Sequence, residues 1–132
     1  MKYSKVTYKY KLQEDEVFFV DIKDFDIKTD YFELNINGVL VVKRNYCFDG
    51  ASGPTIDTKN SMRASLLHDV LYQMMRERLL PQSYRAYADK MLTKICIEDG
   101  MNKLRATTWG FAVKTFAASC AKPKTIEIFT AP

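Results

Sequence analysis

The chain has 132 residues, of which 47% are hydrophobic and 27% charged; this length suits one cored domain, and this composition excludes a disordered protein. The net charge is +4, and the basic excess lies in residues 45–132, where twelve basic side chains stand against eight acidic ones, whereas residues 1–44 hold eight of each. This excess is too dilute for a nucleic-acid-binding surface, but it is compatible with an anionic partner such as a phosphate or a membrane surface.

Three cysteines, Cys47, Cys96 and Cys120, are too few for a disulfide framework and lack a metal-binding spacing, so we expect reduced thiols in a cytoplasmic protein. The N-terminal residues lack the apolar run of a signal peptide. The longest apolar stretch, residues 106–121, is interrupted by Lys114 and is shorter than the roughly 20 residues of a membrane span. We therefore expect a soluble protein without a transmembrane segment.

The first third of the chain predicts a small antiparallel meander. Four segments have the alternating or apolar pattern of strands: 6–12, 17–22, 31–36 and 39–43. The last two flank Asn37-Gly38, a dipeptide that favours a two-residue type I′ hairpin. The final strand would lead directly into a glycine-bearing loop, residues 45–54, at the edge of the sheet.

The next part of the chain predicts two helices joined by a short connection. The first would begin at Asn60 or Ser61 as N-cap and run to about Arg78, and its apolar residues on nearly all sides are typical of a central helix. The second would hold Pro81 in its first turn and end at Gly100, a residue type common just after a helix.

A third helix is expected at about 103–120, where Ala, Trp and Phe dominate and charge is sparse. We interpret it as a core helix, with an interfacial membrane helix as the alternative. Residues 125–129 would form a last strand. The predicted fold is one α+β domain spanning residues 1–132, with an antiparallel β-meander in the N-terminal third packed with a three-helix C-terminal part.

One group of residues in the two-helix region has the chemistry of a general-base site. His68, the only histidine, and Tyr72 lie four residues apart on one helix face. If the two helices are antiparallel, Asp89 of the second can face this turn. Its carboxylate would hold one imidazole nitrogen, fix the tautomer and make the other nitrogen a better base, while Tyr72 would donate a hydrogen bond to Asp89.

A metal site is predicted beside this group. Asp69 lies about 100° round the helix from His68 and would face the loop that contains Asp49. Two carboxylates and loop carbonyls form an all-oxygen environment that suits calcium, or magnesium with water ligands. Such an ion would polarise an ester or phosphoryl oxygen while His68 activates water.

Two covalent mechanisms use the same residues. Ser52 or Cys47 would be the nucleophile, with His68 as the base and Asp89 as the group that orients it. Neither nucleophile lies in a recognised motif, because residues 50–53 lack the spacing of the strand–turn–helix elbow. The water mechanism is therefore preferred.

Each residue also has a purely structural interpretation. A histidine on an apolar helix face is commonly a hydrogen-bonded core residue. Asp89 can instead form an exposed ion pair with Arg85, Asp69 can pair with Arg76 or point to water, and the glycine-bearing loop can be a simple turn. The coincidence of all these residues in one helical hairpin and its lead-in loop favours a site.

This region contains three separated motifs in order, Asp49-Gly50-Ala51-Ser52-x-Pro54, Ala64-x-x-Leu67-His68-Asp69-x-Leu71-Tyr72 and Ala88-Asp89-Lys90. Together they resemble a family of small phage and prophage proteins catalogued as a domain of unknown function. The resemblance covers roughly residues 38–117 and implies a phage-encoded protein of the host-cell cytoplasm, without supplying an activity.

The His-Asp-x-x-Tyr helix is also similar to the site of calcium-dependent phospholipases of the A-two type. In those enzymes the helix follows a glycine-rich calcium loop, and an aspartate from an antiparallel helix holds the histidine. The resemblance implies His68 as the base, Asp69 as a calcium ligand, and Tyr72 and Asp89 as supporting groups, with residues 52–57 near the calcium loop. The chain departs from these enzymes in its few cysteines and its fewer loop glycines.

The leading expectation is thus a phage-encoded, hydrolase-like protein that acts on an ester-bearing substrate such as an anionic phospholipid, with calcium assistance. The second is a non-enzymatic phage protein that binds a host or virion protein and uses the His-Asp-Tyr cluster as a buried polar brace. A nucleic-acid binder is disfavoured by the weak basic excess.

Overall fold

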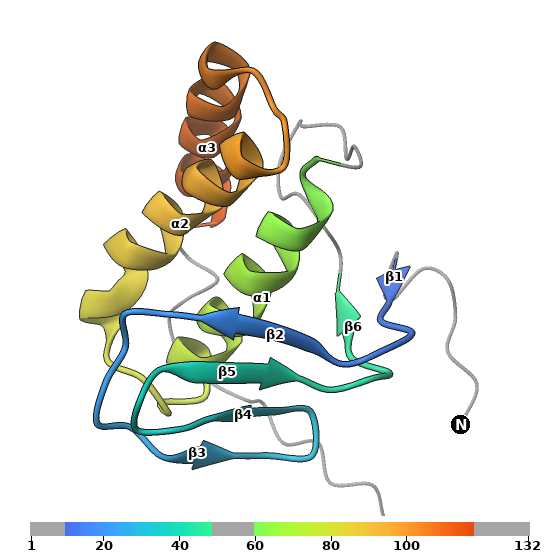
Figure 1. The fold of residues 1–132 in the computed structure, drawn as a ribbon. Coiled ribbons are helices and arrows are strands. Elements are labelled where there is room, and N and C mark those ends of the chain that lie inside the picture. The colour runs from blue at the N-terminus through green and yellow to red at the C-terminus, as the bar shows by residue number, and fades with distance from the viewer. Residues whose placement is uncertain (1–9, 49–59, 118–132) are drawn as a thin grey trace, which may run out of the picture.

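The computed structural model describes residues 10–48 and 60–117 of the chain. Antiparallel strands occupy the first range and three α-helices the second, which confirms the predicted α+β class (Figure 1). The elements are β1 (Tyr10–Lys11), β2 (Glu16–Phe19), β3 (Ile27–Lys28), β4 (Phe32–Leu34), β5 (Val39–Val42), β6 (Cys47–Phe48), α1 (Met62–Arg76), the short 3-10 helix η1 (Gln82–Tyr84), α2 (Arg85–Glu98) and α3 (Lys103–Ala117).

The strands form a four-stranded antiparallel sheet and a separate two-stranded ladder. The sheet has the order β2-β5-β4-β3, and Phe18 of β2 lies opposite Leu40 of β5. The ladder pairs β1 with β6 through Tyr10 opposite Phe48. The sequence prediction missed β3 and β6, which are too short to show a period-two pattern. The strand predicted at 125–129 lies outside the described residues.

The β4–β5 turn differs from the predicted two-residue type I′ hairpin. The amide of Asn35 donates to the carbonyl of Val39 at 3.0 Å, so the loop has three residues, 36–38. Only Gly38 adopts a positive φ, 87°, whereas a type I′ turn needs two such residues. The side chain of Asn35 explains the longer loop, because its Oδ1 accepts hydrogen bonds from the amides of Asn37 and Val39, both at 3.0 Å.

Helix α1 is the central helix, as its pattern predicted. Its N-cap is Ser61, and it ends at Arg76, two residues before the expected position. Ten of its fifteen residues are buried, on nearly all sides of the helix. They are Ala64, Ser65, Leu66, Leu67, His68, Val70, Leu71, Tyr72, Met74 and Met75.

Helix α2 lies antiparallel to α1 and packs against both α1 and α3, which lies at the end of the molecule away from the sheet (Figure 1). Its C-terminus is closed as predicted by Gly100, whose φ of 99° is favoured by glycine. The amide of Gly100 donates to Ile97 O at 3.1 Å and that of Met101 to Cys96 O at 2.9 Å, the two bonds of a Schellman motif. Arg63 at the start of α1 pairs with Asp99 at 3.0 Å, which holds the two helices antiparallel.

The buried residues of the sheet and of all three helices form one core cluster. Two tyrosines connect these parts by hydrogen bonds. The Tyr46 hydroxyl donates to Gln73 Oε1 of α1 at 2.6 Å, and the Asp21 amide donates to the Tyr87 hydroxyl of α2 at 2.8 Å. The sheet therefore fixes the position of both helices that carry the predicted site.

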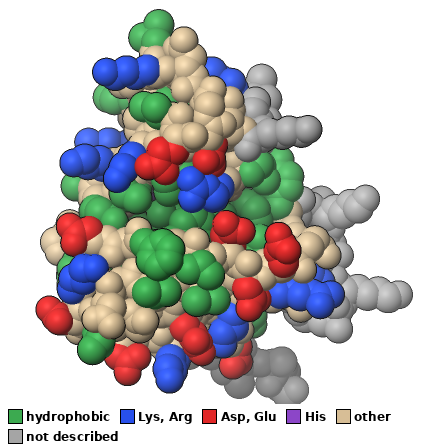
Figure 2. Space-filling model, viewed as in Figure 1, with side chains coloured by type: hydrophobic (Ala, Val, Ile, Leu, Met, Phe, Trp, Pro, Cys, Tyr) green, Lys and Arg blue, Asp and Glu red, His purple; other side chains and the backbone are tan. Residues whose placement is uncertain are grey.

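The outer face of the sheet carries exposed hydrophobic side chains among charged ones (Figure 2). The largest on β2 are Val17 and Phe19, which are 45% and 80% exposed. Their inward neighbour Phe18 is buried, as the alternation of side chains along a strand requires.

Candidate functional site

The α1–α2 hairpin brings together His68, Tyr72 and Asp89. The His68 Nε2 lies 2.8 Å from Asp89 Oδ1, and the Tyr72 hydroxyl donates to the same oxygen at 2.6 Å. This is the spatial arrangement that the helix spacing predicted. Asp89 is only 8% exposed, so the alternative of an exposed ion pair with Arg85 is wrong.

The three side chains are enclosed. His68 is 3% exposed and Tyr72 2%. Their rings lie side by side, with centroids 4.1 Å apart and an interplanar angle of 30°. This packing restricts both rings to one orientation, so the two hydrogen bonds to Asp89 need little further ordering of the side chains.

The charge on Asp89 determines which nitrogen of His68 carries a proton. Burial alone would raise the pKa of Asp89, but hydrogen bonds from His68 and Tyr72, together with the charges of His68 and Arg85, lower the pKa below its ordinary value. Asp89 is therefore ionised at neutral pH and can only accept hydrogen bonds. His68 accordingly donates from Nε2, and Nδ1 is the nitrogen that can accept a proton.

The second oxygen of Asp89, Oδ2, is buried and has no hydrogen-bond partner among the described residues. The same is true of Ser65 Oγ, which lies on α1 three residues before His68. Ser65 was not among the predicted site residues. Its spacing from His68 was a signal, because residues three apart share a helix face.

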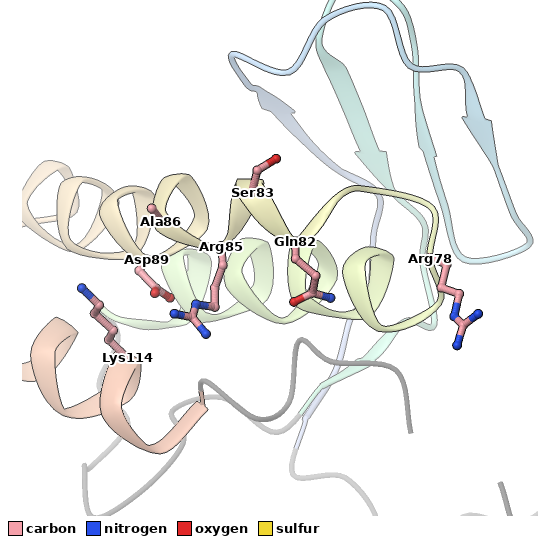
Figure 3. A pocket seen from close by; sticks show the side chains of 7 residues that line it. All are labelled: Arg78, Gln82, Ser83, Arg85, Ala86, Asp89 and Lys114. Carbon is pink, nitrogen blue, oxygen red and sulfur yellow. The ribbon is translucent and has the colours of Figure 1, made fainter. Parts of the chain in front are cut away.

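A pocket of about 850 Å³ adjoins Asp89, and we call it the basic pocket. It lies where η1 and the first turn of α2 face Lys114 of α3. Figure 3 shows Arg85 and Lys114 on either side of the Asp89 carboxylate, with Arg78 at the far end. Its lining residues are Arg78, Gln82, Ser83, Arg85, Ala86, Asp89 and Lys114.

The basic excess beyond residue 44 is visible in the sequence, but its grouping into a pocket is not. Arg78, Arg85 and Lys114 come from a loop and two helices, so no local motif contains them. Only the packing of α3 against α2 brings Lys114 to the other two.

The predicted metal site lies mostly outside the described residues. Asp49, Ser52 and the rest of the loop up to residue 54 belong to that part of the chain. Asp69 is half-buried on α1 and engaged in an interaction. Within residues 10–48 and 60–117, no three His, Cys, Asp or Glu side chains are grouped to hold an ion. Calcium binding therefore stays a prediction, for which the described residues supply one carboxylate, Asp69.

Cys47, the other predicted nucleophile, is half-buried in β6, and its Sγ donates to the carbonyl of Asn45 at 3.5 Å. Cys96 is buried in α2, and both thiols are free. The pKa of Cys96 is raised to about 11 by burial and by the charge of Asp99. Neither of the two cysteines in the described ranges forms a disulfide.

Comparisons with protein-family models, with curated proteins and with solved structures found no match for the chain. The two resemblances noted in the sequence thus stay predictions. No helix within the described ranges has the length and hydrophobicity needed to cross a membrane.

Proposed function

We propose that the protein is a phage-encoded, hydrolase-like protein in which His68 is a general base, Asp89 orients it and Tyr72 supports Asp89. One observation carries this proposal: a single carboxylate oxygen accepts hydrogen bonds from both His68 Nε2 and the Tyr72 hydroxyl. This arrangement directs the opposite nitrogen, Nδ1, to the reacting group. The phage motifs support the origin and, with it, the cytoplasm of the host cell as the place of action.

In the proposed reaction, Nδ1 of His68 removes a proton from water as the water attacks an ester. The imidazolium that forms is stabilised by the ionised Asp89, while Tyr72 keeps the carboxylate in place, and the imidazolium returns the proton to the alcohol oxygen as the ester bond breaks. Calcium held by Asp69 and Asp49 would polarise the ester carbonyl or phosphoryl oxygen. The substrate proposed is an anionic phospholipid or a small ester.

The test is hydrolysis of short-chain phospholipids and of a chromogenic ester, with and without millimolar calcium. His68→Gln should lower the rate at least about 100-fold, because a positioned base contributes that much, while circular dichroism stays unchanged. Asp26→Asn, an exposed change in the loop just before β3, is the matched control and should keep full activity. Equal rates for wild type and His68→Gln would contradict the proposal.

The enclosure of His68, at 3% exposure, favours a second candidate. In this case the protein is not an enzyme but binds a host or virion protein, and the His68–Asp89–Tyr72 cluster is a structural brace. His68→Ala would then mainly reduce stability, by about 1–3 kcal/mol for a broken buried hydrogen bond. A wild-type protein without esterase activity, whose His68→Ala variant unfolds at lower urea, would support the brace.

A further inference from the structure

The basic pocket brings three cations together with a single carboxylate, that of Asp89. Among the described residues, Arg78, Arg85 and Lys114 form no ion pair with a carboxylate, although Arg63 and Lys43 elsewhere do. Guanidinium groups recognise phosphate by paired hydrogen bonds, and an ammonium group adds a compact positive charge. A pocket that gathers three such groups against one ionised carboxylate keeps a net positive charge and is suited to an anion.

A second observation, at Asp89, narrows the class of ligand that the pocket can bind. Asp89 is 8% exposed and lines the pocket, and its Oδ2 lacks a hydrogen-bond donor among the described residues. A buried acceptor without a donor costs free energy, so a ligand that brings a donor gains from filling this position. A fully ionised alkyl phosphate without a hydroxyl group would satisfy the cations and leave this oxygen unpaired.

We infer that the basic pocket binds a phosphate group whose organic part carries a neighbouring hydroxyl group. Arg85 and Lys114 hold the phosphate, Asp89 Oδ2 accepts from the hydroxyl, and Arg78, Gln82 and Ser83 line the remaining space. The volume of about 850 Å³ accommodates more than a phosphate ion. This inference goes beyond the proposed function, because His68 is not among the lining residues and need not be a base for the pocket to bind.

Calorimetric titration with glycerol 3-phosphate, propyl phosphate and inorganic phosphate at low ionic strength tests the inference. Glycerol 3-phosphate should bind with one saturable site and at least several-fold more tightly than propyl phosphate, which lacks the hydroxyl. Arg85→Gln and Lys114→Gln should each weaken binding about tenfold or more, as expected for a lost charge-assisted hydrogen bond. Lys103→Gln, an equal charge change at the start of α3, should leave the dissociation constant unchanged.

The same phosphate could belong to a free molecule or to a lipid headgroup, and co-sedimentation with vesicles separates the two. Binding to phosphatidylglycerol vesicles but not to glycerol 3-phosphate, lost in Arg85→Gln, would assign the pocket to a headgroup. No binding to either, or an equal loss in Lys103→Gln, would overturn the inference. Equal affinity for propyl phosphate would overturn the role of Asp89. Binding is measured without an ester substrate, so a loss of binding and a loss of hydrolysis are separate results.

Discussion

At the scale of single residues, Asp89 has the largest set of consequences. Its Oδ1 accepts from two enclosed donors, so removal of the carboxylate breaks the hydrogen bonds of both His68 and Tyr72 to it. Asp89→Ala should therefore destabilise the protein by about 3 kcal/mol at pH 6, measured by urea unfolding. Asp26→Ala, which removes an exposed carboxylate, should change the stability by less than about 0.5 kcal/mol.

The lowered pKa of Asp89 also predicts how the stability difference between wild type and Asp89→Ala depends on pH. A group with a pKa lower in the folded state stabilises the protein above its ordinary pKa, 3.8 here, and this contribution is lost as the pH falls through the folded value. The stability difference between wild type and Asp89→Ala should thus shrink below pH 3.8. A difference that stays constant down to pH 2 would show that the carboxylate is not held as described.

The raised pKa of Cys96, about 11, predicts its reactivity. Because the thiolate is the reactive form, iodoacetamide at pH 8 should modify Cys47 well before Cys96 in the folded protein. Peptide mapping by mass spectrometry distinguishes the two sites. In urea, both should react at similar rates, and rapid labelling of Cys96 without urea would show that α2 does not bury it.

At the scale of elements, the contact between α2 and α3 depends on Gly110. A Cβ atom at this position would collide with Thr93 Oγ1 of α2. Gly110→Ala should therefore destabilise the protein by about 1–3 kcal/mol, although alanine is the better helix former by about 1 kcal/mol. Urea unfolding measures this change.

Thr93→Ala provides the control for this prediction. It removes the colliding oxygen, so in its background Gly110→Ala should be neutral or stabilising. If the stability changes of Thr93→Ala and Gly110→Ala simply add in the double variant, the two helices do not approach each other at this point.

At the scale of the whole molecule, the hydrogen bond from the Asp21 amide to the Tyr87 hydroxyl connects the sheet to α2. Tyr87→Phe should lower the free energy of unfolding by about 0.5–1.5 kcal/mol. Tyr84→Phe is the matched control, because the Tyr84 ring contacts Phe25 edge-on and this contact does not use the hydroxyl. Equal effects of the two changes would argue against a specific connection through Tyr87.

The helical hairpin was predictable because its information is local. The period of α1, the closing Gly100 and the spacing of His68 and Tyr72 each depend on a few neighbouring residues. The start of the second helix was predicted wrongly, because Pro81 is extended and precedes η1, and α2 begins only at Arg85. The predicted two-residue β4–β5 loop was wrong because the side chain of Asn35 competes with the backbone for the turn amides. The basic pocket was not predictable, since Lys114 reaches Arg85 only through the packing of α3 on α2.

The two candidate sites differ in the helices that they require. His68, Tyr72 and Asp89 belong to α1 and α2, whereas the basic pocket also requires Lys114 from α3, the helix farthest from the sheet (Figure 1). A transient detachment of α3 would therefore dismantle the pocket and leave the hydrogen-bonded cluster assembled. Amide hydrogen exchange should then be faster in α3 than in the buried turns of α1, and a phosphate-bearing ligand should slow exchange in α3 most.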